Sequence, residues 1–412
     1  MRVLWLSNVP FPDICKELNI STPVVGGWMY AGAVSLLKAN NDIKLAVVCG
    51  YSGTKIKHIT DYQIEYFLFP NSKNLKLLES SFIEINQIFN PDISHLHGTE
   101  YIHSLAYTNI ADKSKLVVSI QGLVSVYASY YFGGISEMQI KKEITFRDII
   151  RNDSLFQQKL KMEERGNNEV LLLKKIKHVI GRTTWDYANV WALNLDFNYH
   201  FCNESLRSGF YKKKWMYESC ELHTIFLSQA HYPIKGLHQV IKAVSIVLKH
   251  FPKVKVYVAG NNFVSKPKYK RNGYASYINN LMDEYNVRKQ FVFLGTLNEK
   301  EMIEQYLKAN IFICPSMIEN SPNSVGEAQL LGTPCIASYV GGTMDMIENE
   351  ETGLLYRFEE YTKLAECIYT LFSDRLLCNE ISRKGRLIAK KRHDSIKNAR
   401  NLINIYQTIM SQ

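Results

Sequence analysis

The chain has 412 residues, of which 46% are hydrophobic and 21% charged, a balance that excludes disordered and collagen-like proteins. At this length two domains of about 200 residues each are favoured over a single core. The net charge of +10 lies almost wholly in the second half, because residues 1–205 hold 21 basic and 20 acidic side chains and residues 206–412 hold 28 and 19. A basic second domain suits anionic ligands such as nucleotide diphosphates or lipid headgroups.

Short runs rich in β-branched and aromatic residues alternate with longer helical patterns along the whole chain. This alternation is typical of βα units around parallel sheets. The strands predicted in the first half are Val3–Ser7, Lys44–Cys49, Ile64–Phe69, Ile93–Leu96, Leu116–Ile120, His178–Gly181 and Tyr199–Cys202. Those in the second half are Thr224–Ser228, Lys255–Ala259, Phe291–Leu294, Ile311–Cys314, Pro334–Ala337 and Gly353–Tyr356. Two successive sets predict an α/β protein with two doubly wound, Rossmann-like domains.

The predicted domains are residues 1–206 and 207–390, because the basic and aromatic stretch GFYKKKWMYESCE interrupts the alternation there. A polar segment at about 136–177 predicts a pair of amphipathic helices inserted in the first domain. The tyrosine-rich stretch VYASYYFGG precedes it. Together they would either sit on an anionic membrane surface or form a helical cap with inward aromatics.

The most specific motif is IFICPSMIENSPNSVGEAQLLGTPCIASYVGG, at residues 311–342. It predicts a strand, a loop over Asn320–Val325 and a helix that Glu327 opens, so that several backbone N–H groups converge on a site for a diphosphate. A carboxylate beside such a site would repel the anion and should instead accept hydrogen bonds from hydroxyls. Glu319 is therefore assigned to a transferred sugar and Glu327 to a ribose. The plainer alternative is that Glu327 favours the helix dipole and Glu319 is exposed.

With these motifs the sequence resembles the family 4 retaining glycosyltransferases, of the bacterial surface-polysaccharide type. The motifs PS-x-x-E-x7-E, LGTP, GG and TGLL stand in the family's order within residues 224–356. The resemblance implies a GT-B fold, in which two Rossmann-like domains face each other across a cleft. It also implies that the last helix, residues 391–412, packs back toward the N-terminal domain, which would hold the acceptor.

The resemblance implies that further residues belong to the site. Gly26 and Gly27 match the glycine pair of the family's first βα loop, where the backbone approaches the donor or acceptor. Lys235 matches the family lysine that neutralises the leaving diphosphate, but Ala230 stands where the family has an arginine. The compensating cation would be His231 or a basic residue from elsewhere.

Gln121 stands where many relatives have a histidine, and since an amide does not titrate it cannot act as a general base. This fits a front-face retaining mechanism, in which the leaving phosphate takes the acceptor proton. His95 and His97 are expected on opposite faces of a strand, with His97 toward the cleft or structural. Arg182 and Asp186 would flank the acceptor or form a structural ion pair.

Donor contacts are also expected at the carboxyl ends of the second-domain strands. The residues assigned to them, beside Gly26, Gly27 and Glu327, are Gly260, Gly295, Thr296, Leu297, Ser321, Pro322, Asn323, Ser324 and Val325. No D-x-D motif occurs, so Lys235 and the helix N-terminus are expected to replace the divalent metal that other transferases hold there.

The sequence thus predicts a metal-independent transferase that moves a sugar from a UDP- or GDP-linked donor onto a saccharide or polyprenyl-linked acceptor, in capsule, O-antigen or other surface-polysaccharide synthesis. Eight scattered cysteines without C-x-x-C favour the cytoplasm, and a membrane contact would be peripheral. The alternatives are a catalytically inactive partner subunit that binds a nucleotide sugar and a nucleotide-sugar epimerase. Nucleic-acid binding is disfavoured, because the basic runs lack interleaved aromatics apart from Tyr269.

Overall fold

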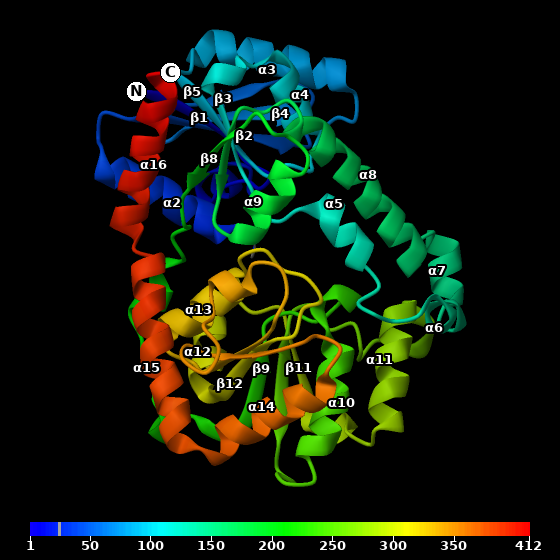
Figure 1. Cartoon of the computed structure of the whole chain (residues 1–412). Coiled ribbons are helices and arrows are strands. Elements are labelled where there is room, and N and C mark those ends of the chain that lie inside the picture. The colour runs from blue at the N-terminus through cyan, green and yellow to red at the C-terminus, as the bar shows by residue number, and fades with distance from the viewer. Residues whose placement is uncertain (24–25) are drawn as a thin grey trace. The chain divides into compact units, whose positions relative to one another are not determined.

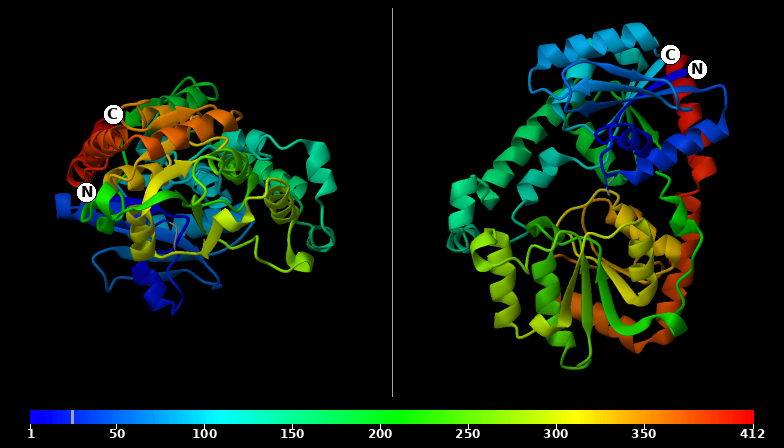
Figure 2. Two further views of the ribbon diagram at one scale, coloured as in Figure 1. Left: turned by 90° about the horizontal axis from the view of Figure 1, so that it is seen from below. Right: turned by 180° about the vertical axis from the view of Figure 1, so that it is seen from behind.

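The computed structural model describes residues 1–23 and 26–412, and their contacts divide the chain into two compact units. Unit 1 comprises residues 1–126, 163–207 and 393–412, and unit 2 comprises residues 127–162 and 208–392. Each unit is built on its own sheet, and helices pack against both faces of that sheet (Figures 1 and 2).

The sheet of unit 1 has eight strands in the order β3-β4-β2-β1-β5-β6-β7-β8, and all neighbours are parallel except β3 and β4. The strands are β1 (Arg2–Leu6), β2 (Lys44–Tyr51), β3 (Lys57–Ile59), β4 (Glu65–Pro70), β5 (Ile93–His97), β6 (Leu116–Ser119), β7 (His178–Gly181) and β8 (Asn198–Phe201). The helices that begin in this unit are α1 (Pro12–Glu17), α2 (Gly27–Ala39), α3 (Leu75–Phe89), α4 (Ile102–Ile110), α5 (Val124–Tyr127), α9 (Thr184–Trp191) and α16 (Ser395–Met410).

Alternating side chains give this sheet two apolar faces. Val3 and Trp5 of β1 pack with α2 and α16, whereas Leu4 and Leu6 pack with α3. The C-terminal helix α16 is held by a buried hydrogen bond, in which Trp5 Nε1 donates to the Tyr406 hydroxyl at 2.9 Å. The predicted helix at residues 391–412 corresponds to α16, which belongs to unit 1, whereas the preceding helix α15 (Arg375–Arg392) belongs to unit 2.

The sheet of unit 2 has six parallel strands in the order β11-β10-β9-β12-β13-β14. They are β9 (Glu221–Leu227), β10 (Lys255–Ala259), β11 (Phe291–Gly295), β12 (Ala309–Cys314), β13 (Cys335–Ser338) and β14 (Leu354–Tyr356). The remaining helices of this unit are α6 (Glu137–Lys142), α7 (Phe146–Arg151), α10 (Leu237–Val247), α11 (Gly273–Glu284), α12 (Glu299–Lys308), α13 (Asn323–Leu331) and α14 (Tyr361–Ser373).

Every predicted strand is present, with boundaries within three residues of those expected. The strand β3 was not predicted, because its three residues lie at the sheet edge and carry no buried alternation. The prediction that the polar insertion at 136–177 belongs to the first domain was wrong for residues 136–162, whereas residues 163–177 belong to unit 1. Residues 127–162 pack with unit 2, and the segment holds α6, α7 and the start of α8 (Leu155–Leu173) rather than two helices.

In each sheet the strand order reverses once beside the first strand of the unit. Strand β1 lies between β2 and β5, and β9 lies between β10 and β12. The loops after β1 and β5, and those after β9 and β12, therefore lead in opposite directions. In an open parallel sheet this is the point where ligands bind.

Candidate functional site

At the reversal in unit 2, Lys235 and Glu319 meet. Lys235 ends the short 3₁₀ turn Pro233–Lys235 after β9, and Glu319 follows β12. The Lys235 Nζ forms an ion pair with Glu319 Oε1, and Ser316 Oγ donates to the same oxygen at 2.7 Å. Burial favours the neutral amine, but the charge and hydrogen bond of Glu319, together with Tyr232 and Cys314, outweigh burial and raise the pKa of Lys235. The lysine therefore stays protonated and positively charged at neutral pH.

Two glycines make this arrangement possible. Gly236 has φ of 68°, and a Cβ on it would lie 1.8 Å from the Pro315 carbonyl oxygen. Gly341 has φ of 51°, and a Cβ there would lie 1.9 Å from the Glu319 carbonyl oxygen. Both positions need a residue without a side chain. The Lys-Gly and Gly-Gly pairs of the sequence thus bring three loops into close contact around the ion pair.

The helix α13 begins at Asn323 beside this pair, so the predicted diphosphate loop is partly helical. Its N-cap residue Pro322 makes no side-chain hydrogen bond to the first turn. Glu327 is the fifth residue of α13 and is 7% exposed. The expectation that Glu327 opens the helix was wrong, since the helix starts four residues earlier. Its carboxylate is therefore past the first turn, where a helix dipole has little effect.

The remaining predicted donor residues occupy the same edge of the sheet. Gly260 and Gly295 follow β10 and end β11, and the Gly260 N–H donates to the Gly295 carbonyl at 2.9 Å. Thr296 is exposed and Leu297 is half-buried, so both are accessible next to these glycines. Ser321, Asn323 and Ser324 are also partly exposed, whereas Pro322 and Val325 are buried at the start of α13.

The missing family arginine has no simple replacement at its own position. Ala230 is 1% exposed and packs in the core. The neighbouring His231 has its pKa lowered by burial and by the charge of Lys235. The structure therefore disfavours His231 as the compensating cation, because it is neutral at pH 7.

Tyr127 is a residue of this region that the sequence did not single out. Burial and the Glu319 carboxylate raise the pKa of its phenol well above the usual range, and the backbone N–H of Asn320 hydrogen-bonds to it. The segment after it is anchored nearby, since His238 Nε2 contacts the Gly133 carbonyl oxygen at 2.8 Å. Of the aromatics in this segment, Tyr131 is buried and Tyr130 is 38% exposed, and the segment belongs to unit 2.

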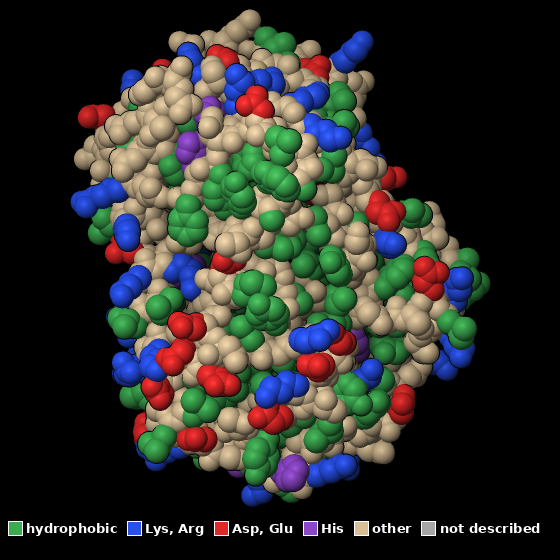
Figure 3. Space-filling view, viewed as in Figure 1, with side chains coloured by type: hydrophobic (Ala, Val, Ile, Leu, Met, Phe, Trp, Pro, Cys, Tyr) green, Lys and Arg blue, Asp and Glu red, His purple; other side chains and the backbone are tan. Residues whose placement is uncertain are grey.

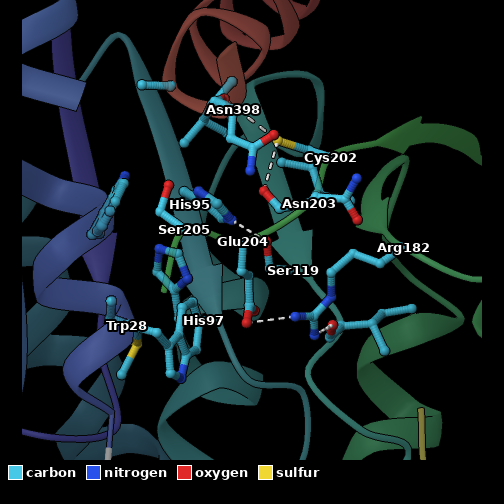
Figure 4. A pocket seen from close by; sticks show the side chains of 17 residues that line it. Trp28, His95, His97, Ser119, Arg182, Cys202, Asn203, Glu204, Ser205 and Asn398 are labelled. Carbon is cyan, nitrogen blue, oxygen red and sulfur yellow. Dashed lines mark hydrogen bonds and ion pairs between the residues drawn. The ribbon is translucent and has the colours of Figure 1, made fainter. Parts of the chain in front are cut away.

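Unit 1 has a pocket at its own reversal, where β1, β5, β6 and β7 end (Figure 4). His95 and His97 both line it, and their ring centroids are 4.0 Å apart. The expectation that they point to opposite faces was wrong, because residues two apart on a strand share a face. His95 is saturated, with Nδ1 2.6 Å from the Tyr406 hydroxyl and Nε2 2.6 Å from Ser119 Oγ.

His97 differs from His95 in its bonding. It is 4% exposed, and neither ring nitrogen has a hydrogen-bond partner among the residues that the structure describes. Burial and the nearby Arg182 lower its pKa to about 3. His97 is thus a neutral ring that can donate one hydrogen bond and accept another within the pocket. The indole of Trp28 lies beside it, with ring centroids 6.0 Å apart.

Opposite these rings lies an ion pair that the sequence did not predict. Arg182 NH1 is 2.5 Å from Glu204 Oε2, and the Arg182 guanidinium also donates to the Ile120 carbonyl at 2.9 Å. Asp186, the expected partner, accepts the backbone N–H of Arg182 at 2.9 Å and the Tyr199 hydroxyl at 2.5 Å. Glu204 has no motif around it that could have identified it.

The other predicted residues of unit 1 border this pocket. Gly26 and Gly27 stand at the start of α2, directly before the lining residues Trp28 and Met29. Gln121 follows β6, and its Nε2 lies 3.9 Å from the Met29 sulfur. The predicted site residues thus form two sets, one at the reversal of each sheet.

Neither a metal cluster nor a membrane span is present in the described part of the chain. Residues 1–23 and 26–412 hold no group of three or more His, Cys, Asp or Glu side chains that could bind a metal ion. Among the same residues, no helix combines the length and apolar character needed to cross a bilayer.

Comparison with known proteins identifies relatives over part of the chain. The chain is 25% identical over 203 residues to the putative glycosyltransferase YtcC of Bacillus subtilis, covering 49% of this chain and 48% of YtcC. It is 26% identical over 159 residues to an Escherichia coli UDP-Gal:alpha-D-GlcNAc-diphosphoundecaprenol alpha-1,3-galactosyltransferase, covering 37% of this chain and 38% of that enzyme. The matches thus span less than half the length of these relatives.

Solved structures match over nearly the whole chain. The Anabaena protein HepE in complex with UDP-glucose superposes with a TM-score of 0.68 at 15% identity, covering 99% of this chain and 100% of HepE. This likeness shows the fold, which is the predicted GT-B architecture of two Rossmann-like domains. The family model of the glycosyl transferases group 1 matches residues 220–401, which include Lys235, Glu319 and Glu327. Over that region, which is less than half of the chain, the sequence is similar to the glycosyl transferases group 1.

Proposed function

We propose that the protein is a retaining glycosyltransferase, which moves a sugar from a nucleotide-diphosphate donor onto a saccharide or lipid-linked acceptor. The observation that carries the proposal is the contact of Lys235 with Glu319 at the reversal of the unit 2 sheet. A movable cation and a carboxylate stand together where a parallel sheet binds its ligands, beside the start of a helix. The Escherichia coli relative, by its name, uses UDP-Gal and a diphosphoundecaprenol-linked sugar.

The proposed reaction uses the two charges separately. When the donor binds, its diphosphate replaces Glu319 as the partner of Lys235. The freed Glu319 carboxylate then accepts hydrogen bonds from hydroxyls of the sugar. The bond from the sugar C1 to the phosphate oxygen then breaks as the acceptor oxygen bonds to C1 on the same face. The acceptor proton passes to the departing phosphate oxygen. Lys235 stabilises the charge on that oxygen, and Glu319 stabilises the positive charge at C1.

For the acceptor we propose the pocket of unit 1. Its Arg182 and Glu204 neutralise each other, and His97 is uncharged, so the pocket suits a neutral hydroxylated group. The indole of Trp28 offers an apolar face for a sugar ring. Either ring nitrogen of His97 would form a hydrogen bond with an acceptor hydroxyl, which would give a partner to a buried nitrogen that has none among the described residues.

Three further parts of the proposal come from the sequence. The enzyme would act in the cytoplasm, in surface-polysaccharide synthesis, and all eight cysteines are free thiols as that compartment requires. It would need no divalent metal, since Lys235 would neutralise the diphosphate. Full loss of turnover in EDTA with rescue by manganese would contradict this last part.

A thermal-shift screen against UDP, GDP, ADP and their common sugars tests the donor assignment. A ligand at 100 times its dissociation constant adds about 2.7 kcal/mol of stability. Transfer assays then compare Glu319→Gln with the matched variant Glu327→Gln. The first should lower turnover more than nucleotide affinity, and the second should weaken binding of the nucleotide through its ribose. Equal turnover of Glu319→Gln and the wild type would remove Glu319 from its role.

A second candidate is a catalytically inactive subunit that binds a nucleotide sugar, favoured by the buried Ala230 and the neutral His231. It predicts a thermal shift with nucleotide sugars but neither transfer nor donor hydrolysis by the purified chain. An epimerase would convert the donor without any acceptor. The same assay therefore separates the three.

A further inference from the structure

The short helices α6 and α7 in unit 2 expose large apolar side chains. Phe146, Ile149 and Ile150 of α7 are 77%, 68% and 68% exposed, and Met138 of α6 is 70% exposed. Positions i, i+3 and i+4 share one side of a helix, so the three residues of α7 form a continuous apolar face. Figure 3 shows hydrophobic and basic side chains together at the right-hand edge, where α6 and α7 lie in Figure 1.

The opposite side of α7 is anchored, so this face is held outward. Asp148 is 1% exposed, and it accepts the backbone N–H of Gly273 at the start of α11 at 2.7 Å. Thr145 caps α7 with Asp148 and donates its hydroxyl to the Arg271 carbonyl at 3.0 Å. Rotation of α7 to bury the apolar face would break these buried hydrogen bonds, which cost free energy to leave unmade.

The exposed charges around this face have one dominant sign. Within residues 136–162, the exposed basic residues are Lys141, Lys142, Arg151 and Lys161, and the exposed acidic residue is Glu137. The other acids are engaged within unit 2: Glu143 accepts from Asn280 at 3.2 Å, and Asp148 and Asp153 contact Arg147. Arg147 is therefore part of the folded scaffold and not of the exposed basic set.

We propose that this surface, formed by Met138, Lys141, Lys142, Phe146, Ile149, Ile150 and Arg151 and called the α6–α7 face, binds the surface of a lipid bilayer that contains anionic lipids. Apolar side chains flanked by basic ones are what an interfacial helix presents to such a bilayer, where the rings enter the acyl boundary and the lysines contact headgroups. The charge excess favours this partner over an uncharged protein surface. The inference does not rest on the proposed transferase activity.

Co-sedimentation of the full chain with vesicles tests the proposal. The vesicles contain phosphatidylcholine alone or mixed with phosphatidylglycerol. The apolar variant is Phe146→Ser, Ile149→Ser and Ile150→Ser combined, and the basic variant is Lys141→Glu, Lys142→Glu and Arg151→Glu combined. Matched controls outside the α6–α7 face are Leu376→Ser with Leu195→Ser, both exposed, and Lys212→Glu, Lys213→Glu and Lys214→Glu, also exposed.

The wild type and both controls should bind the anionic vesicles, and more weakly at high salt. The apolar variant should lose at least tenfold in partition although its charges are intact, and the basic variant should lose its preference for anionic lipid. Unfolding midpoints like that of the wild type show that the variants fold. Absent binding by the wild type, or equal binding by the apolar variant, overturns the proposal. So does a wild-type dimer that the apolar variant dissociates, because the face would then join two copies.

Discussion

Each unit carries a largely buried ion pair of a basic residue with a glutamate beside the carboxyl ends of its strands, but the two pairs follow different strands of their sheets and are bonded differently. In unit 2, Lys235 meets Glu319 on loops that follow β9 and β12. In unit 1, Arg182 follows β7 and meets Glu204, and it is also held by the carbonyl oxygens of Ile120 and Gln121. An arginine bound on several sides stays in place, whereas a flexible lysine can exchange its carboxylate for another anion.

This difference teaches what each charge pair is for. In the proposed reaction, the Lys235 ammonium exchanges the Glu319 carboxylate for the diphosphate of the donor. The Arg182 guanidinium fixes the ends of β6 and β7 and shapes a pocket that is neutral as a whole. We therefore expect changes in unit 2 to act on catalysis and changes in unit 1 to act first on stability.

The largest expected effect is the loss of transfer rate in Lys235→Met. Removal of one preorganised donor to a developing anion lowers turnover by up to about 10³-fold, or about 4 kcal/mol of transition-state stabilisation. Transfer rates at saturating donor measure this. Lys249→Met, at an exposed lysine beyond α10, is the matched control and should retain wild-type rates. A rate for Lys235→Met within threefold of the wild type would contradict the assigned role.

Arg182→Met should destabilise unit 1 by about 3 kcal/mol, because it leaves the Glu204 carboxylate buried without its partner. Denaturant unfolding measures the loss. The double variant Arg182→Met with Glu204→Gln should recover part of it, since no lone charge remains. Nucleotide affinity of unit 2 should be unchanged. If Arg182→Met unfolds at the wild-type midpoint, the guanidinium is not a structural anchor.

The fold and half of the site could be read from the sequence for a physical reason. Buried parallel strands are short apolar runs, so thirteen of the fourteen strands have a local signal, and β3, at an exposed edge, has none. Glu319 is marked by its place in the motif after a predicted strand, and Lys235 by its match to the family lysine. Their contact follows from the strand order.

Long-range packing could not be read in the same way. Glu204 and Tyr127 reach their sites through contacts between segments far apart in the chain. No motif surrounds Glu204, and the tyrosine-rich stretch does not show which of its tyrosines lies near Glu319. Residues 127–162 join unit 2 through long-range contacts such as the hydrogen bond of Asp148 with Gly273. An amphipathic pattern shows that a helix has a buried side but not which domain covers it.

Because His97 is held neutral, we expect the stability of unit 1 to depend on pH. Its pKa is lowered to about 3 in the folded state, against about 6.5 when unfolded. Between these values the unfolded chain binds more protons, so stability should fall as the pH drops from about 6.5, by at most about 1.4 kcal/mol per pH unit for this residue. His97→Gln should flatten the curve relative to the wild type. Parallel curves of the two proteins between pH 4 and 7 would show that His97 is not held neutral.

The smallest effect is expected for His231→Gln. Burial and the charge of Lys235 keep this imidazole neutral, so its loss removes no cation from the donor site. Dissociation constants for UDP and GDP should change by less than about twofold, or about 0.4 kcal/mol. A larger loss that grows as the pH falls toward 6 would mean that the diphosphate raises the pKa of His231 and recruits it as the second cation. In that case two cations of unit 2, Lys235 and His231, would bind the diphosphate. Unit 1 would differ more strongly, because its Arg182 cation is already paired with Glu204.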